Sequence, residues 1–289
     1  MKSIFGLVLF VVASVAMTMA QGTYTQIDVP GSIATICSGI NTNGDIVGWY
    51  VDATKVHGFL LSGGVYTTID YPGAPETTLR GVNDAGEIVG FTSSNPVTGF
   101  LYDVSTQTYT VISYPNAGNT YPYAINASGV IAGTYFDVNR NTVYGFELLG
   151  SSYKQIVPPG AQNARVSGIS SSGVLAGYVT LGSFPHHKET FLFNHGSFEP
   201  IALAHATGVA VSGIDPAGTA LVGQYYPTST TTAGFLYQIG SLRSLQFPGS
   251  SLTSALGVNS ADTVVGYFYD SSFNAHGFTW TSSTHEALK

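Results

Sequence analysis

Two arginines and two tyrosines stand in segments where an otherwise regular sequence becomes irregular. They are Arg80, Tyr121, Tyr123 and Arg165. A guanidinium group offers a planar fork of N–H donors to anions, and a tyrosine ring offers an apolar face with a polar tip. These four residues predict a binding site for an anion or for an array of sugar hydroxyls. The alternative is that both arginines pair with nearby carboxylates such as Glu76 and that the tyrosines only pack.

Histidines suggest a second kind of site. His57 and His276 each precede a Gly-Phe pair, and His186 and His187 are adjacent in the longest irregular segment. Protein zinc sites need closely spaced histidines on one element or supporting carboxylates, and this pattern is missing. We therefore expect no metal and no cofactor, and we keep His57 and His276 as candidate ligand-binding residues.

The familiar catalytic motifs do not occur in the sequence. It has no Gly-x-Ser-x-Gly elbow, no His-Glu-x-x-His, no phosphate loop and no dinucleotide fingerprint. Acidic residues do occur in the irregular segments, at Asp52, Glu76, Asp137 and Glu189. Two of them could meet in space as the carboxylate pair of a glycoside hydrolase. We assign no catalytic residue, and whether the protein is an enzyme stays open.

Composition narrows the class of protein. Of the 289 residues only 9% are charged, 12% are aromatic and 35 are glycine, and the net charge is −7. The aromatic content excludes a disordered chain, and the scarcity of charge argues against a mainly helical one. The negative charge argues against a nucleic-acid partner. Cys37 is the single cysteine, so no internal disulfide can form, and we expect it to be a small buried residue.

Residues 1–20 have the features of a secretory signal peptide. Lys2 is followed by an apolar stretch over 4–12, and the small residues Thr18 and Ala20 precede a cleavage position. No later segment is long and apolar enough to cross a membrane. We therefore expect residues 21–289 to form one domain that is secreted or lies in the periplasm or cell envelope.

Three motifs recur in fixed order with a period of 42 to 45 residues. The first has the form Gly-Ile-Asn-x-x-Gly-x-Ile-Val-Gly and begins at Gly39, Gly81, Ala124, Gly168, Gly213 and Gly257. The second contains a phenylalanine, at Phe59, Phe100, Phe146, Phe191, Phe235 and Phe278. The third resembles Tyr-Thr-x-Ile-Asp-x-Pro-Gly and begins at Tyr24, Tyr66, Tyr109, Tyr153, Phe198 and Leu242.

Each period contains four short strand candidates. Asn and Gly suit the tight turn between the first two strands, and proline ends the fourth. Four strands in about 43 residues are typical of a β-propeller blade. The chain starts with a fourth-strand motif at Tyr24 and ends after a third-strand motif near Trp280. We therefore predict an all-β, six-bladed β-propeller with four-stranded blades, in which the N-terminal strand closes the last blade.

This geometry gives the repeated residues structural roles. The first strand of a blade lies nearest the axis, so the first glycine of each repeat should sit where the six strands converge. The repeated phenylalanines should pack between blades. Loops that enter the inner strands, and loops between second and third strands, share one face and vary most here, as expected of segments that carry function.

The three motifs together resemble the bacterial extracellular HAF-repeat family, named for a His-Ala-Phe-like triplet. Matching triplets are found at 57–59 and 276–278, while the four middle repeats depart from them. The resemblance covers residues 24–281 and implies a secreted or envelope protein. It implies no general biochemical activity, so no catalytic set is carried over.

These observations favour a non-catalytic binding protein that recognises a glycan or an extracellular protein through the propeller loops. We expect it to be a monomer without a membrane span. One alternative is a hydrolase or lyase acting on extracellular polysaccharide with the same scaffold. Another is a structural protein of the envelope.

Overall fold

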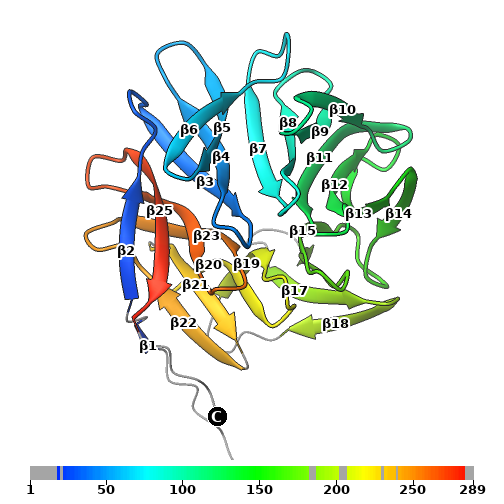
Figure 1. The fold of residues 1–289 in the computed structure, drawn as a ribbon. Coiled ribbons are helices and arrows are strands. Elements are labelled where there is room, and N and C mark those ends of the chain that lie inside the picture. Colours follow the sequence, from blue (N-terminus) through cyan, green and yellow to red (C-terminus); the bar gives the residue numbers. More distant parts are fainter. Residues whose placement is uncertain are drawn as a thin grey trace, which may run out of the picture.

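The computed structural model describes residues 18–19, 22–181, 187–201, 207–228, 231–238 and 240–283. Six antiparallel sheets are arranged in a ring about a central axis (Figure 1). Within the described residues there is no helix with the length and apolar character needed to cross a membrane. The predicted six-bladed β-propeller is confirmed. The predicted signal peptide lies outside the described residues except for β1 (Thr18–Met19), which runs parallel to β22 (Ser241–Leu245).

The first three blades are continuous in sequence, and their strands run from the axis outwards. Blade 1 contains β3 (Ala34–Ile40), β4 (Ile46–Val51), β5 (Val56–Ser62) and β6 (Val65–Ile69). Blade 2 contains β7 (Thr77–Val82), β8 (Glu87–Thr92), β9 (Gly99–Asp103) and β10 (Thr108–Ile112). Blade 3 contains β11 (Ala117–Ile125), β12 (Ile131–Asp137), β13 (Thr142–Leu149) and β14 (Ser152–Ile156).

The last three blades follow the same plan. Blade 4 contains β15 (Arg165–Ile169), β16 (Leu175–Leu181), β17 (His187–Asn194) and β18 (Ser197–Ile201). Blade 5 contains β19 (Thr207–Ile214), β20 (Ala220–Tyr226), β21 (Ala233–Gln238) and β22. Blade 6 contains β23 (Leu252–Val258), β24 (Val264–Tyr269), β25 (Ala275–Ser282) and, outermost, β2 (Gly22–Ile27).

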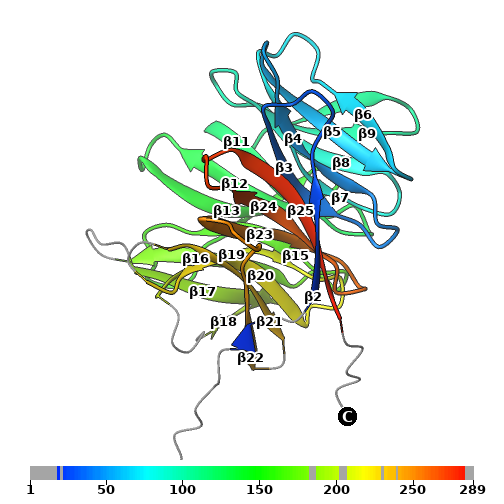
Figure 2. The same cartoon turned by 90° about the vertical axis from the view of Figure 1, so that its left-hand side faces the viewer.

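Blade 6 closes the ring with strands from both ends of the chain. β2 pairs antiparallel with β25, and Tyr24 lies opposite Trp280. Figure 1 shows the blue β2 beside the red β25, and Figure 2 shows the same pair from the side. The predicted closure by the N-terminal strand is confirmed. It covers a strand edge of β25 that would otherwise be open to pairing with another chain.

The repeated phenylalanines join neighbouring blades. Their exposed fractions are 0–4%. Phe146 of blade 3 packs with Val89 and Ile112 of blade 2, and Phe191 of blade 4 packs with Ala132 of blade 3. Burying one such ring contributes about 1.5–3 kcal/mol. The hydrophobic core is therefore six clusters, each shared by two blades, as the repeat pattern predicted.

The glycine that begins five of the six repeats, replaced by Ala124 in the third, lies where backbones from different blades approach one another. A Cβ atom on Gly39 would come within 2.6 Å of the carbonyl oxygen of Arg80, and one on Gly257 within 3.2 Å of Cα of Gly39. A side chain would push the strands apart at these positions, so the predicted role at the axis is confirmed. Cys37, two residues before Gly39, is fully buried with a free thiol, as expected.

Candidate functional site

A cavity of about 350 Å³ opens along the axis at the end where the first strands enter the ring. We call it the loop-end cavity. Its lining side chains include the cations Arg80, Arg165 and Lys188, the aromatic residues Trp49, Tyr123, Tyr178, Tyr267 and Tyr269, and Gln224. Its volume falls within the range of small-ligand sites, which is about 300–1,000 Å³.

A β-bulge in the first strand of every blade directs one residue into this cavity. Pairing of the first two strands skips the residue before each repeated glycine, so that residue is left out of the register. A bulge bends the strand and re-aims the side chain it carries. The six bulge residues all line the cavity, and they are Ser38, Arg80, Tyr123, Ser167, Ser212 and Leu256. The same backbone device thus presents different chemistry from different blades.

Aromatic rings surround the side chain of Arg80. Its Cζ atom lies 5.0 Å from the ring centroid of Tyr123 and 5.7 Å from that of Phe91, which indicates cation–π contacts. Phe91 meets the ring of Tyr121 edge-on at 5.2 Å, and Tyr121 lies parallel to Tyr123 at 6.4 Å. Tyr121 itself is not among the lining residues. Its ring packs beside that of Tyr123.

Blade 4 supplies the other two cations. Arg165 pairs in register with Tyr178, and the Nζ atom of Lys188 lies 5.1 Å from the Tyr178 ring centroid. Burial, together with the charge of Arg165, lowers the pKa of Lys188. Burial raises the pKa of Tyr178, and the charge of Arg165 partly opposes that rise. The cations of this blade are therefore held close enough to act on one another.

Neither arginine pairs with a carboxylate in the part of the chain that the structure describes. No ion pair or hydrogen bond joins the side chain of Arg80 or Arg165 to any described residue, so pairing with Glu76 is not observed. Among the described lining residues there is also no Asp or Glu. The cavity is thus positively charged in a protein whose net charge is −7. It can bind an anion while its aromatic wall contacts an apolar ring face.

Six of the aromatic and polar residues that line the cavity were not predicted from the sequence. They are Trp49, Tyr178, Lys188, Gln224, Tyr267 and Tyr269. All except Lys188 and Tyr269 directly follow the glycine that ends the first motif. Side chains alternate along a strand, so this position faces the axis whenever that glycine faces the neighbouring sheet. Its residue type changes from blade to blade, and that irregularity inside a regular motif was the available signal.

The opposite end of the channel is formed by the turns between the first two strands. There a smaller cavity of about 120 Å³ is lined by asparagines of the turns, by the Ile or Val before them and by the six bulge residues, which line both cavities. The amide nitrogen of Asn41 donates to the carbonyl oxygen of Asn83 at 3.2 Å, and Asn83 donates likewise to Asn126 at 3.1 Å. Asn126 donates to Ser170, and Asn259 donates to Asn41, both at 3.1 Å. We call these linked residues the asparagine belt.

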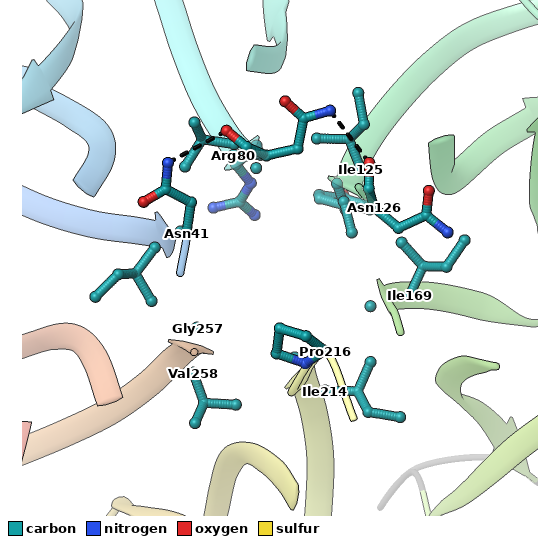
Figure 3. A pocket seen from close by; sticks show the side chains of 18 of the residues that line it. Asn41, Arg80, Ile125, Asn126, Ile169, Ile214, Pro216, Gly257 and Val258 are labelled. Atoms are coloured by element: carbon teal, nitrogen blue, oxygen red, sulfur yellow. Dashed lines mark hydrogen bonds between the residues drawn. The ribbon is translucent and has the colours of Figure 1, made fainter. Parts of the chain in front are cut away.

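The belt explains more of the turn motif than a tight hairpin requires. The side-chain oxygen of Asn126 accepts from the backbone N–H groups of Ser128 and Val130, both at 3.0 Å, while its nitrogen reaches the next blade. Gly129 supplies the positive φ of 74° that the turn needs. Figure 3 looks into this end, with Asn41 and Asn126 on the rim and the Arg80 side chain pointing into the opening.

The two candidate histidines lie outside the loop-end cavity. His57 bridges two carboxylates, with Nδ1 2.7 Å from Asp70 and Nε2 3.3 Å from Asp52. His276 repeats the arrangement in blade 6 and lies 2.9 Å from Asp28 and 3.6 Å from Asp270.

In both blades the ring joins the end of the fourth strand to the loop after the second. The stacked rings of Tyr50 on His57 and of Phe268 on His276 complete each arrangement. The histidines therefore tie loops together within their own blades.

The other candidates for metal binding or acid–base chemistry are dispersed. Over the residues that the structure covers, no group of three or more His, Cys, Asp or Glu could hold a metal ion. Asp52, Glu76, Asp137 and Glu189 are not among the residues that line the loop-end cavity. His186 and the side chain of His187 lie outside the described residues.

Comparison with known proteins bears on the fold. No family model matches the chain, and no curated protein was found to match it. Similar solved structures include TolB from Acinetobacter baumannii, with TM-score 0.58, 13% identity and 83% of this chain covered. The chain spans 64% of the length of that TolB chain.

Two further solved structures resemble the chain over nearly their whole length. The Aleuria aurantia lectin, solved with Fucα1-6GlcNAc, has TM-score 0.55, 13% identity and coverage of 90% of this chain and 95% of the lectin. A gluconolactonase from Xanthomonas campestris has TM-score 0.52, 13% identity and coverage of 86% and 88%. At such identities the likeness concerns the fold alone, and the chain is a six-bladed β-propeller.

Proposed function

We propose that this protein binds a glycan, without catalysis, in the loop-end cavity. One observation carries the proposal. The guanidinium groups of Arg80 and Arg165 have no carboxylate partner among the described residues, and they stand in a cavity walled by tyrosines and a tryptophan. Hydroxyl groups of a sugar would accept from these donors while its ring face packs on an aromatic side chain. The lectin among the similar structures shows that this fold can hold a sugar.

A second candidate function is elimination on an acidic polysaccharide. Lys188 favours it, because burial and Arg165 lower its pKa and so bring its neutral form closer to physiological pH. In such a reaction Lys188 would take the proton beside the sugar carboxylate as the C–O bond to the leaving sugar breaks. Ultraviolet absorbance of the unsaturated product distinguishes this activity from binding. Hydrolysis by a carboxylate pair has no comparable support in this cavity.

The location of the protein is part of the proposal. The HAF-repeat resemblance and the apolar N-terminus support export to the cell surface or beyond, where a glycan would be encountered. N-terminal sequencing of the protein recovered from the medium or envelope tests this. We expect the chain to begin at Gln21.

The binding proposal is tested on a glycan array with three forms of the purified protein. They are the wild type, an Arg80→Ala/Tyr123→Ala double variant, and Arg140→Ala as a matched control. Arg140 also lies over a tyrosine ring, 5.8 Å from that of Tyr144, but it does not line the cavity. We expect wild-type binding that the control keeps and the double variant loses. Binding retained by the double variant, or none by the wild type, would overturn the proposal.

A further inference from the structure

We propose that the glycan is acidic, and that its carboxylate or sulfate group is held by Arg165, Arg80 and Lys188. This inference rests on the proposed function and specifies the ligand of the same site. It concerns the charge of the bound sugar, which neither the fold nor the aromatic wall determines.

Cations elsewhere in the molecule have carboxylate partners. Lys55 lies 3.0 Å from Asp70, Lys154 lies 3.8 Å from Glu147, and Arg140 lies 4.0 Å from Asp137. Nine Lys and Arg residues face sixteen acidic ones in the whole chain, so partners are plentiful.

The three cations of the cavity nevertheless have no carboxylate partner among the described residues. Arg243, on the outer strand β22, is the other described cation without one, and it stands apart from these three. A group of half-buried like charges is unfavourable by itself, so an anionic partner would stabilise it.

The cations of the cavity also act on one another. Lys188 is about half buried, and both its burial and the charge of Arg165 disfavour its charged form. On the other wall Arg80 acts on the hydroxyl of Tyr267 across the channel, and Arg165 acts on Tyr121. Both guanidinium groups line the same cavity. An anion bound there would be close to all three positive charges.

Aromatic contacts hold two of the three cations and leave their N–H donors available. Tyr123 and Phe91 contact the guanidinium of Arg80 through cation–π interactions, which do not use its N–H donors in hydrogen bonds. Tyr178 does the same for Lys188. The donors remain available for charge-assisted hydrogen bonds, and arginine binds carboxylate and sulfate oxygens through two parallel ones. Neutral hydroxyls would use these donors without balancing the charge.

The experiment compares oligosaccharides that share one backbone. They are a uronic acid oligomer, the same oligomer with its carboxyl groups reduced to alcohols, and a sulfated form of the reduced oligomer. Isothermal titration of the purified protein measures each affinity. We expect the uronate or the sulfated form to bind at least about tenfold more tightly than the neutral form, as expected for charge-assisted hydrogen bonds.

Variants separate this inference from the proposed function. Arg165→Gln should remove the preference for the acidic sugar, Arg165→Lys should keep part of it, and Arg140→Gln should keep all of it. Circular dichroism checks that each variant folds. Equal affinity for acidic and neutral forms, lost in Arg80→Ala/Tyr123→Ala, would overturn the charge inference and leave glycan binding standing. Absence of binding to every form would overturn both.

Discussion

The two ends of the central channel are built from the same six strands and differ in how their polar groups are used. At the turn end, the amides of the asparagine belt bond to backbone groups of their own turn and of the next blade. At the loop end, the guanidinium groups of Arg80 and Arg165 have no such partner among the described residues. Asparagine occupies the belt position in four of the six blades, whereas the bulge position at the loop end carries serine, arginine, tyrosine or leucine. Repetition in this chain therefore marks the scaffold, and irregularity marks the place where a ligand would complete the hydrogen bonding.

The largest expected effect is a loss of stability in a scaffold variant whose binding site is unchanged. Phe146→Ala removes a fully buried ring that joins blades 2 and 3. We expect the free energy of unfolding to fall by about 3–5 kcal/mol. Urea denaturation measures it, and sugar affinity at low denaturant should be unchanged. A loss below 1 kcal/mol, on the order of a tolerated volume-conserving swap, would contradict the role given to these rings.

Variants of the asparagine belt should have the next largest effect on stability, and the size of the loss should differ between blades. Asn126→Ala leaves two backbone donors of its turn without their acceptor, so we expect a loss of about 1–3 kcal/mol. Ser170 occupies the same position in blade 4, and its hydroxyl accepts from Val174 but extends no amide to blade 5. Ser170→Ala should therefore cost less. Equal costs in urea denaturation would show that the bonds between blades add nothing.

Variants of the loop-end cavity should lose affinity for the ligand and keep their stability. Arg165→Gln should reduce affinity for an acidic sugar by about tenfold or more while the midpoint of urea denaturation barely moves. The physical reason is that the Arg165 side chain has no hydrogen bond to a described residue that could be lost. A large drop in stability with unchanged affinity would make Arg165 part of the scaffold and break the distinction between the two ends.

The affinity for an acidic sugar should also depend on pH. The lowered pKa of Lys188 means that it loses its charge below the ordinary lysine value of 10.5 in the free protein, and a bound anion would raise that pKa again. Affinity for an acidic sugar should thus be complete below the free-protein pKa. It should fall as pH rises from the free to the bound pKa. Titrations across alkaline pH should show this fall in the wild type and lose it in Lys188→Gln, with Lys154→Gln as control.

The smallest effect concerns Cys37, which belongs to the scaffold. Burial raises the pKa of its thiol, with the charge of Asp28 acting in the same direction. A colorimetric thiol reagent should react with Cys37 no faster than the protein unfolds. Fast reaction of the folded protein would show that the interface of blades 1 and 6 opens readily.

The fold could be predicted from the sequence because every blade repeats the same strands, turns and phenylalanines. The site could be predicted only in part. Arg80, Tyr123 and Arg165 were found because they end the irregular loops that lead into the first strands. Tyr178 and Lys188 were missed because they are distant in sequence from the predicted residues of the first strands. Pairing between strands brings them to the axis. The histidines were chosen for their chemistry, but the carboxylates that hold them come from the neighbouring strand end and loop.

The most direct test of the proposed binding site is a crystal structure of the protein grown with the oligosaccharide that binds best on the array. We expect electron density for the sugar in the loop-end cavity, with an acidic group within hydrogen-bond distance of Arg165 and a ring face against Tyr178. Density at the asparagine belt, or in the clefts between blades, would contradict it.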